Sequence, residues 1–291
     1  MATGKNSNIE MMPLSTGRKT IWHLQQMKNK GEKISMVGTA YMDPLWSSLA
    51  EKAGIDLVRY TAPGETCADR ERNISWWTRA IRKMAPNVCL NAVMQTPQYK
   101  DGPTAIECGS RILADGADSV MCMGVTNETL ACMSANYVPV FGHVGCLSGW
   151  QTGQFGGYRR QGKTAEDAYK IWRMAYEYQE NGMCGMTIEM TNIEVTNAIA
   201  AKLAIPVIEV AAGGAADGSE LVIFDLMGFL PPEAMAKHSK AYASVAAEAM
   251  KGYMGFDHEV KEGAYPQEEH GWHMDPAELE KFNDMLDKDI H

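Results

Sequence analysis

Eight short stretches rich in apolar residues alternate with helical stretches along this chain, and this alternation restricts the fold more than any other feature. The stretches lie at residues 34–41, 56–61, 88–94, 119–124, 138–143, 186–190, 206–211 and 221–224. Several are almost continuously apolar, which is typical of parallel strands buried on both faces. Repeated βα units predict an α/β protein with a parallel sheet, and eight of them favour a closed (β/α)8 barrel, the TIM barrel. A doubly wound open sheet is the alternative.

The helical stretches carry ordinary start signals and periodicity. Thr164 begins a variant capping box, and apolar residues then recur at i, i+3, i+4 and i+7. Residues 20–29 predict an extra helix before the first strand. We therefore expect a flexible N-terminal segment at 1–18, one barrel over 19–273 and a peripheral C-terminal segment at 274–291.

Composition excludes several classes of protein. The chain has 27 basic and 36 acidic residues, a formal charge of −9, and no dense basic run, which disfavours a nucleic-acid partner. No apolar run approaches the roughly 18 residues that cross a bilayer, and the polar start lacks the apolar core of a secretory signal. The seven cysteines form no C-x-x-C pair, which favours reduced thiols. We therefore expect a cytoplasmic protein that contacts neither nucleic acid nor membrane.

Polar residues at the ends of the predicted strands are the candidates for chemistry, because barrel enzymes place their active sites there. His143 closes an apolar strand between two glycines, where it is either a packed, capping group or a functional one. Glu189 lies in an otherwise apolar strand end, and a buried unpaired carboxylate is costly. Glu189 is therefore either part of a structural ion pair or a general acid or base. The residues alone leave both alternatives open.

Several motifs together resemble the ketopantoate hydroxymethyltransferase family of the phosphoenolpyruvate/pyruvate barrel superfamily. The resemblance extends from about Thr20 to His270, most of the chain. In chain order, the motifs are Thr39-Ala40-Tyr41, Arg82-Lys83-Met84-Ala85-Pro86-Asn87, Pro139-Val140-Phe141-Gly142-His143-Val144-Gly145, Gly156-Gly157-Tyr158-Arg159-Arg160-Gln161-Gly162, Ile205-Pro206-Val207-Ile208, Asp217-Gly218 and Tyr265-Pro266-Gln267-Glu268-Glu269-His270. The central and C-terminal motifs are specific in combination.

This resemblance implies a (β/α)8 barrel that assembles as a homo-oligomer, a decamer, and transfers a one-carbon unit from methylenetetrahydrofolate to 2-oxoisovalerate. In the family, Mg²⁺ chelates the oxo acid and a glutamate on the sixth strand serves in acid–base chemistry. That glutamate matches Glu189, and the family's histidine on the fifth strand matches His143. The resemblance therefore implies that these two residues are catalytic.

The metal ligands of the family are not matched. The family holds Mg²⁺ with carboxylates at the ends of strands two, three and four, and these positions fall on Thr61 (with Ala62 as the alternative), Val93 and Met123. Mg²⁺ requires hard oxygen ligands, usually including one or two carboxylates. We therefore expect no metal at the family site.

Other residues near the strand ends complete the predicted site. We expect the substrate to be bound by Tyr41, Arg59, Thr61, Ala62, Val93, Met123 and Glu209. Glu209 replaces a small residue of the family pattern, and we hypothesise a second titrating carboxylate near Glu189. Strand alternation leaves open whether Glu209 points outward instead. Glu65 and Asp69 are the acids that would form a relocated Mg²⁺ site.

Three functions remain compatible with these residues. We favour an enzyme that acts without metal on a small oxo compound, by forming or breaking a C–C bond or by proton transfer next to a carbonyl. Methylenetetrahydrofolate stays open as its one-carbon donor. The first alternative is genuine hydroxymethyl transfer to 2-oxoisovalerate. The second is a non-catalytic barrel that serves as a subunit or binds a ligand.

Overall fold

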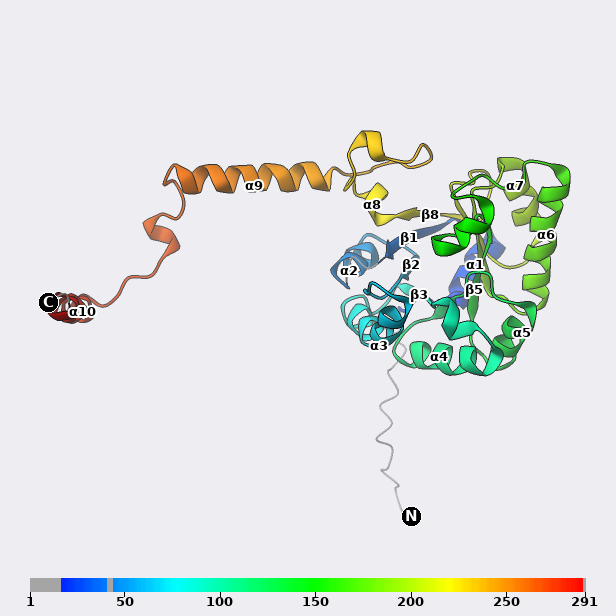
Figure 1. Ribbon diagram of the computed structural model, residues 1–291, viewed down its shortest axis with the longest axis horizontal. Coiled ribbons are helices and arrows are strands. Elements are labelled where there is room, and N and C mark those ends of the chain that lie inside the picture. The colour runs from blue at the N-terminus through cyan, green and yellow to red at the C-terminus, as the bar shows by residue number, and fades with distance from the viewer. Residues whose placement is uncertain (1–16, 41–43, 290–291) are drawn as a thin grey trace, which may run out of the picture. The chain divides into compact units, whose positions relative to one another are not determined.

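The computed structural model describes residues 17–40 and 44–289 (Figure 1). Parallel strands form a closed barrel in which each strand pairs with its neighbours in chain order. The strands are β1 (Ile34–Ala40), β2 (Leu57–Tyr60), β3 (Cys89–Val93), β4 (Ser119–Met121), β5 (Val140–Gly145), β6 (Gly185–Glu189), β7 (Val207–Val210) and β8 (Gly218–Val222). The predicted (β/α)8 barrel is confirmed, and the open sheet is not formed.

Helices follow the strands in the order expected of βα units. They are α1 (Ile21–Lys30), α2 (Pro44–Lys52), α3 (Cys67–Met84), α4 (Gly102–Ala114), α5 (Asn127–Ala135), α6 (Ala165–Glu180), α7 (Ile193–Lys202) and α8 (Ile223–Leu226). Short 3₁₀ helices, η1 (Thr96–Tyr99) and η2 (Gly149–Phe155), lie in the connections after β3 and β5. Helix α1 is the extra helix predicted before the first strand. The predicted start of α6 is also confirmed, because the Thr164 side chain accepts a hydrogen bond from Asp167 N.

Alternation along the strands creates two apolar layers. Val58 and Leu90 face outward and pack in one cluster with helix residues such as Ile74. Leu57 and Cys89, one position earlier on the same strands, face inward and share a second cluster with Leu24 of α1. Because these inward residues begin their strands, α1 closes the amino-terminal end of the barrel. The opposite end, where the strands finish, is left for the βα connections.

The eighth strand begins earlier than predicted. The sequence places a strand at 221–224, whereas β8 is Gly218–Val222. Gly218 pairs with both Ile34 and Ile208, and an added Cβ would overlap the Ile34 carbonyl oxygen. The glycine is therefore required for close strand packing where the barrel closes. Because glycine is also typical of turns, the sequence did not indicate that Gly218 belongs to a strand.

Two compact units divide the chain. The first contains the barrel and extends to Leu226, with Ala236–Lys240 added, and the second comprises Met227–Met235 and Ala241–His291. Within the second unit, α9 (Val245–Lys261) and α10 (Pro276–Asp289) contain no buried residue. Over the described part of the chain, no helix has the length and apolar character needed to span a bilayer. The division into 1–18, 19–273 and 274–291 stays a prediction, and most of its first segment lies outside the described residues.

Candidate active site

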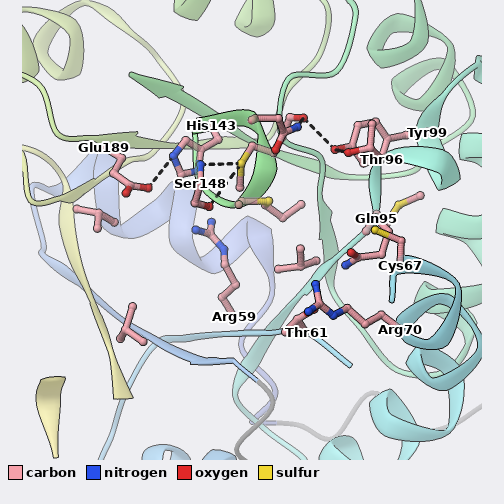
Figure 2. A pocket seen from close by; sticks show the side chains of 18 of the residues that line it. Arg59, Thr61, Cys67, Arg70, Gln95, Thr96, Tyr99, His143, Ser148 and Glu189 are labelled. Atoms are coloured by element: carbon pink, nitrogen blue, oxygen red, sulfur yellow. Dashed lines mark hydrogen bonds and ion pairs between the residues drawn. The ribbon is translucent and has the colours of Figure 1, made fainter. Parts of the chain in front are cut away.

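A cavity of about 470 Å³ lies at the carboxyl ends of the strands (Figure 2). Its wall contains six of the residues predicted to form the site, which are Arg59, Thr61, Val93, Met123, His143 and Glu189. They come from the ends of β2 to β6, so neighbouring strands bring together residues that are far apart in the sequence. This is the end of the barrel at which TIM-barrel enzymes carry their active sites.

Glu189 and His143 form a contact at one side of this cavity (Figure 2). His143 Nε2 lies 3.0 Å from Glu189 Oε2 and also 3.0 Å from the carbonyl oxygen of Cys146. A carbonyl oxygen only accepts hydrogen bonds, so Nε2 must carry a hydrogen. His143 is buried, and its Nδ1 has no hydrogen-bond partner among the described residues. The Nε2–H group of His143 therefore points toward the Glu189 carboxylate, and its Nδ1 is left without a partner among the described residues.

Gly145 allows the ends of β5 and β6 to approach closely enough for this contact. It pairs in register with Glu189 and has a left-handed backbone, with φ +88°. An added Cβ would overlap the carbonyl oxygen of Glu189, which accepts a hydrogen bond of 2.9 Å from Cys146 N. The glycine that ends the Gly142-His143-Val144-Gly145 motif thus sets the position of the catalytic candidate on the next strand.

We predict that Gly145→Ala destabilises the protein by about 1–3 kcal/mol, because it adds backbone strain and displaces Glu189. Urea unfolding measures the loss. Gly31→Ala is the matched control, since Gly31 also has a positive φ of 70° but an added Cβ there meets no atom within 4 Å. Equal losses in the two variants would mean that the left-handed backbone alone, and not the contact with Glu189, accounts for the effect.

Arg59 lies in a buried polar layer directly inside the barrel. Its Nε donates to Asn91 Oδ1 at 2.9 Å, and its two Nη atoms donate to Glu220 Oε2 and Thr187 Oγ1, each at 2.8 Å. The guanidinium also lies over the ring of Phe141, 5.4 Å from its centroid. Burial raises the pKa of the Glu220 carboxyl above its ordinary value, and Arg59 opposes this shift. The layer thus joins β2 to β3, β6 and β8 and places a paired positive charge beneath the cavity.

The three positions matched to the family metal ligands all line the cavity, but they supply few oxygen donors. Thr61 offers one neutral hydroxyl and Val93 offers none. The Met123 sulfur accepts hydrogen bonds from the Ser148 amide at 3.1 Å and from its hydroxyl at 3.5 Å. In the described part of the chain, no three His, Cys, Asp or Glu side chains are grouped so that they could hold a metal ion.

Other predicted residues lie away from the cavity wall. Ala62 is buried in the outer apolar cluster, so Thr61 is the residue of that pair that faces the cavity. Glu65 is exposed, and the Asp69 carboxylate accepts hydrogen bonds from Thr66 at the start of α3 and pairs with Arg72. Tyr41, also predicted to bind substrate, lies outside the described residues.

Glu209 does not line the cavity. It follows Ile208, which faces the barrel interior, so alternation directs Glu209 toward the helices. Its carboxylate accepts hydrogen bonds from the backbone amides of Ala212 at 3.0 Å and Gly213 at 2.8 Å, and from the Ser219 hydroxyl. Among the two orientations left open by the sequence, the outward one is found. This orientation does not support the hypothesis that Glu209 is a second titrating carboxylate beside Glu189.

Two charged residues of the cavity were not predicted. Glu220 was missed because the eighth strand was placed too late; a strand that begins at Gly218 directs Gly218, Glu220 and Val222 inward by alternation. Arg70 was missed because it lies on α3 rather than on a strand. The capping box formed by Thr66 and Asp69 was a signal that could have placed it in the first turn of the helix after β2.

Comparison with known proteins identifies close similarity to one family. Residues 18–268 match the model of the family described as ketopantoate hydroxymethyltransferase. The 3-methyl-2-oxobutanoate hydroxymethyltransferase of Thermotoga neapolitana is 35% identical over 258 residues, which cover 85% of this chain and 94% of that protein. That of Methylibium petroleiphilum, 3-methyl-2-oxobutanoate hydroxymethyltransferase 1, is 28% identical over 296 residues, covering 98% and 99%.

Solved structures support the barrel fold. The structure of 2,3-dimethylmalate lyase, a member of the PEP mutase/isocitrate lyase superfamily, has a TM-score of 0.53 at 10% identity and covers 92% of this chain and 97% of its own. Oxaloacetate acetylhydrolase in complex with 3,3-difluorooxalacetate has a TM-score of 0.54 at 13% identity, covering 94% and 96%. At these identities the similarity concerns the fold alone.

Proposed function

Because the chain belongs to the ketopantoate hydroxymethyltransferase family, we propose that it acts on a small 2-oxo acid, without a carboxylate-bound divalent cation. The reaction removes a proton from the carbon next to the carbonyl, so that a C–C bond can form or break there. The observation that carries this proposal is the Glu189 carboxylate, which contacts His143 at the wall of a cavity in which the family metal positions are Thr61, Val93 and Met123.

In the proposed step, Glu189 acts as the general base. The C–H bond breaks, its proton moves to a carboxylate oxygen of Glu189, and its electron pair forms an enolate whose charge lies on the former carbonyl oxygen. His143 positions the carboxylate through the hydrogen on Nε2. Arg59, which lines the cavity, supplies the positive charge that stabilises the enolate oxygen.

The residues present do not fit a Mg²⁺ ion at the family position. Among the described residues, the carboxylates of the cavity wall are those of Glu189 and Glu220, and each already contacts a basic side chain. Met123 offers a soft sulfur where a hard oxygen is required. No step of the proposed reaction is therefore assigned to a metal.

A second function is hydroxymethyl transfer from methylenetetrahydrofolate to 3-methyl-2-oxobutanoate, the activity named for the relatives. The match over residues 18–268 and the retention of Glu189 and His143 favour it. A non-catalytic barrel is the third alternative, and the Glu189–His143 contact at the cavity argues against it. Assembly as a homo-oligomer and a cytoplasmic location are part of the same proposal, by analogy with the family.

Proton exchange tests the proposal directly. The protein is incubated in D₂O with 3-methyl-2-oxobutanoate, and loss of the C3 proton signal is followed by NMR with EDTA or with added Mg²⁺. We expect exchange above the rate without protein, at equal rates in EDTA and in Mg²⁺, because both the proposed base, Glu189, and the positive charge of Arg59 are supplied by side chains of the protein.

The alternative functions give different results in this experiment. Exchange that requires Mg²⁺ would replace our proposal by the metal-dependent transferase. No exchange with any member of a panel of small 2-oxo acids would favour the non-catalytic barrel. Heat-denatured protein provides the background rate.

A further inference from the structure

We propose that Arg70 binds the carboxylate of the substrate and thereby selects a 2-oxo acid over a neutral ketone. This inference rests on the proposed function, because it assigns a recognition role to a residue of the same cavity. Neither the family motifs nor the predicted site include Arg70. Its role follows from its position, its fixed orientation and the charges around it.

Arg70 is held at the cavity wall by the loop that precedes it. It lies in the first turn of α3, and its Nε donates a hydrogen bond of 3.0 Å to the carbonyl oxygen of Gly64. Gly64 has φ +157°, and an added Cβ would come within 2.8 Å of Arg70 N and within 2.6 Å of Asp69 Cβ. The glycine therefore lets the loop approach the helix closely. This contact orients the guanidinium, and neither Nη group donates to another residue in the described part of the chain.

No described residue of the cavity wall balances the charge of Arg70. The other arginine of the wall, Arg59, forms an ion pair with Glu220 at 2.8 Å. Arg70 forms no ion pair among the described residues, although the neighbouring Arg72 on the same helix pairs with Asp69. A half-buried guanidinium with free Nη donors is a suitable partner for a planar carboxylate, which it can bind in a bidentate manner.

The order of side chains across the cavity matches the order of groups in a 2-oxo acid. Figure 2 shows Arg70 with Thr61 on one side, Glu189 and His143 on the other, and Arg59 between them. A 2-oxo acid has its carboxylate at one end, then the carbonyl, then the carbon that loses a proton. With the carboxylate on Arg70, the carbonyl oxygen lies toward Arg59 and the reacting carbon toward Glu189.

The experiment measures binding separately from turnover. Dissociation constants are determined by calorimetry in EDTA for a panel of small 2-oxo acids, with 3-methyl-2-oxobutanoate as the first probe, and for the ketones that lack the carboxylate, such as 3-methylbutan-2-one. We expect Arg70→Met to weaken binding of the acid by about 10- to 100-fold, because it removes a charge-assisted hydrogen bond, and to leave binding of the ketone unchanged. Arg70→Lys keeps the positive charge but lacks the paired N–H donors of the guanidinium, so its affinity for the acid should fall by an intermediate amount.

Arg72→Met is the matched control, since Arg72 lies two residues away on the same helix with its side chain exposed. It should not change the affinity for acid or ketone. Three outcomes would overturn the assignment. The affinity of Arg70→Met for the acid could be unchanged, or its affinity for the neutral ketone could fall as much as that for the acid. The unmodified protein could also fail to bind the acid at all. If Arg70-dependent binding is found but proton exchange is not, the anion site stands and the proposed reaction fails.

Discussion

Glu189→Gln is expected to slow exchange of the C3 proton by about 10²- to 10⁴-fold, the usual contribution of a general base. Glutamine has nearly the same shape, and its side-chain oxygen can still accept from His143 Nε2. It has no basic oxygen, however, so the proton of the substrate has no acceptor. The variant should therefore bind the oxo acid and fold normally while losing exchange, which NMR in D₂O measures.

The neighbouring strand provides a matched control for this variant. Glu209→Gln changes a carboxylate on β7 that does not line the cavity, and glutamine retains an oxygen acceptor for the amides of Ala212 and Gly213. Exchange should continue in this variant at the rate of the unmodified protein. If both variants lose exchange equally, or if Glu189→Gln retains it, Glu189 is not the base.

Arg59→Met is expected to lower the free energy of unfolding by about 3–5 kcal/mol, the usual cost of breaking a buried ion pair. Both side chains of the Arg59–Glu220 pair are buried, with 8% and 6% exposed. Removing the arginine leaves Glu220, Asn91 and Thr187 without their partner in a layer that is almost fully buried. Urea unfolding measures the loss.

The loss in Arg59→Met should also depend on pH. Burial already raises the pKa of Glu220 above its ordinary value of 4.5, and Arg59 is the largest influence that lowers it. Without Arg59 this pKa rises further. A raised carboxyl pKa contributes stability that is present below the unfolded pKa and is lost as pH increases through the folded pKa. The difference from the unmodified protein should therefore be small at acidic pH and grow as pH rises.

Two further variants separate the ion pair from other effects. Arg59→Met combined with Glu220→Met removes both charges and should regain most of the stability, because an apolar pair replaces an unpaired carboxylate. Arg79→Met breaks the pair with Asp115, in which the arginine side chain is 59% exposed, and should cost less, since solvent partly screens this pair. A single Arg59→Met variant as stable as Arg79→Met would show that Glu220 is solvated or neutral without its partner.

The barrel and part of its site could be predicted because their signals are local. The alternation of apolar strands and capped helices predicts the fold. His143 and Glu189 both lie near the carboxyl ends of such strands, so parallel packing must bring them to one end of the barrel. Orientation within a strand was harder to predict. Val207 and Ile208 are both apolar because β7 is buried on both faces, so periodicity could not tell which face Glu209 joins.

Residues whose role depends on distant partners were not predictable in the same way. The sequence predicts that Arg59 lies at the site, but only closure of the barrel brings it to Glu220 and Thr187. Arg70 depends on the path of the loop at Gly64, which the sequence marks only as a glycine. Such residues are recognised from three-dimensional contacts rather than from spacing along the chain.

The ion pair inside the barrel also has a consequence for synthesis on the ribosome. Glu220 follows Arg59 by 161 residues, so at about 5–20 residues per second the arginine is made about 8–30 s before its partner. During that interval, enclosing β2 would stabilise the nascent chain only slightly, because the unpaired guanidinium of Arg59 would lose its contact with water. The first half of the barrel is therefore expected to stay hydrated and open to chaperones until β8 emerges, and its interior closes only then.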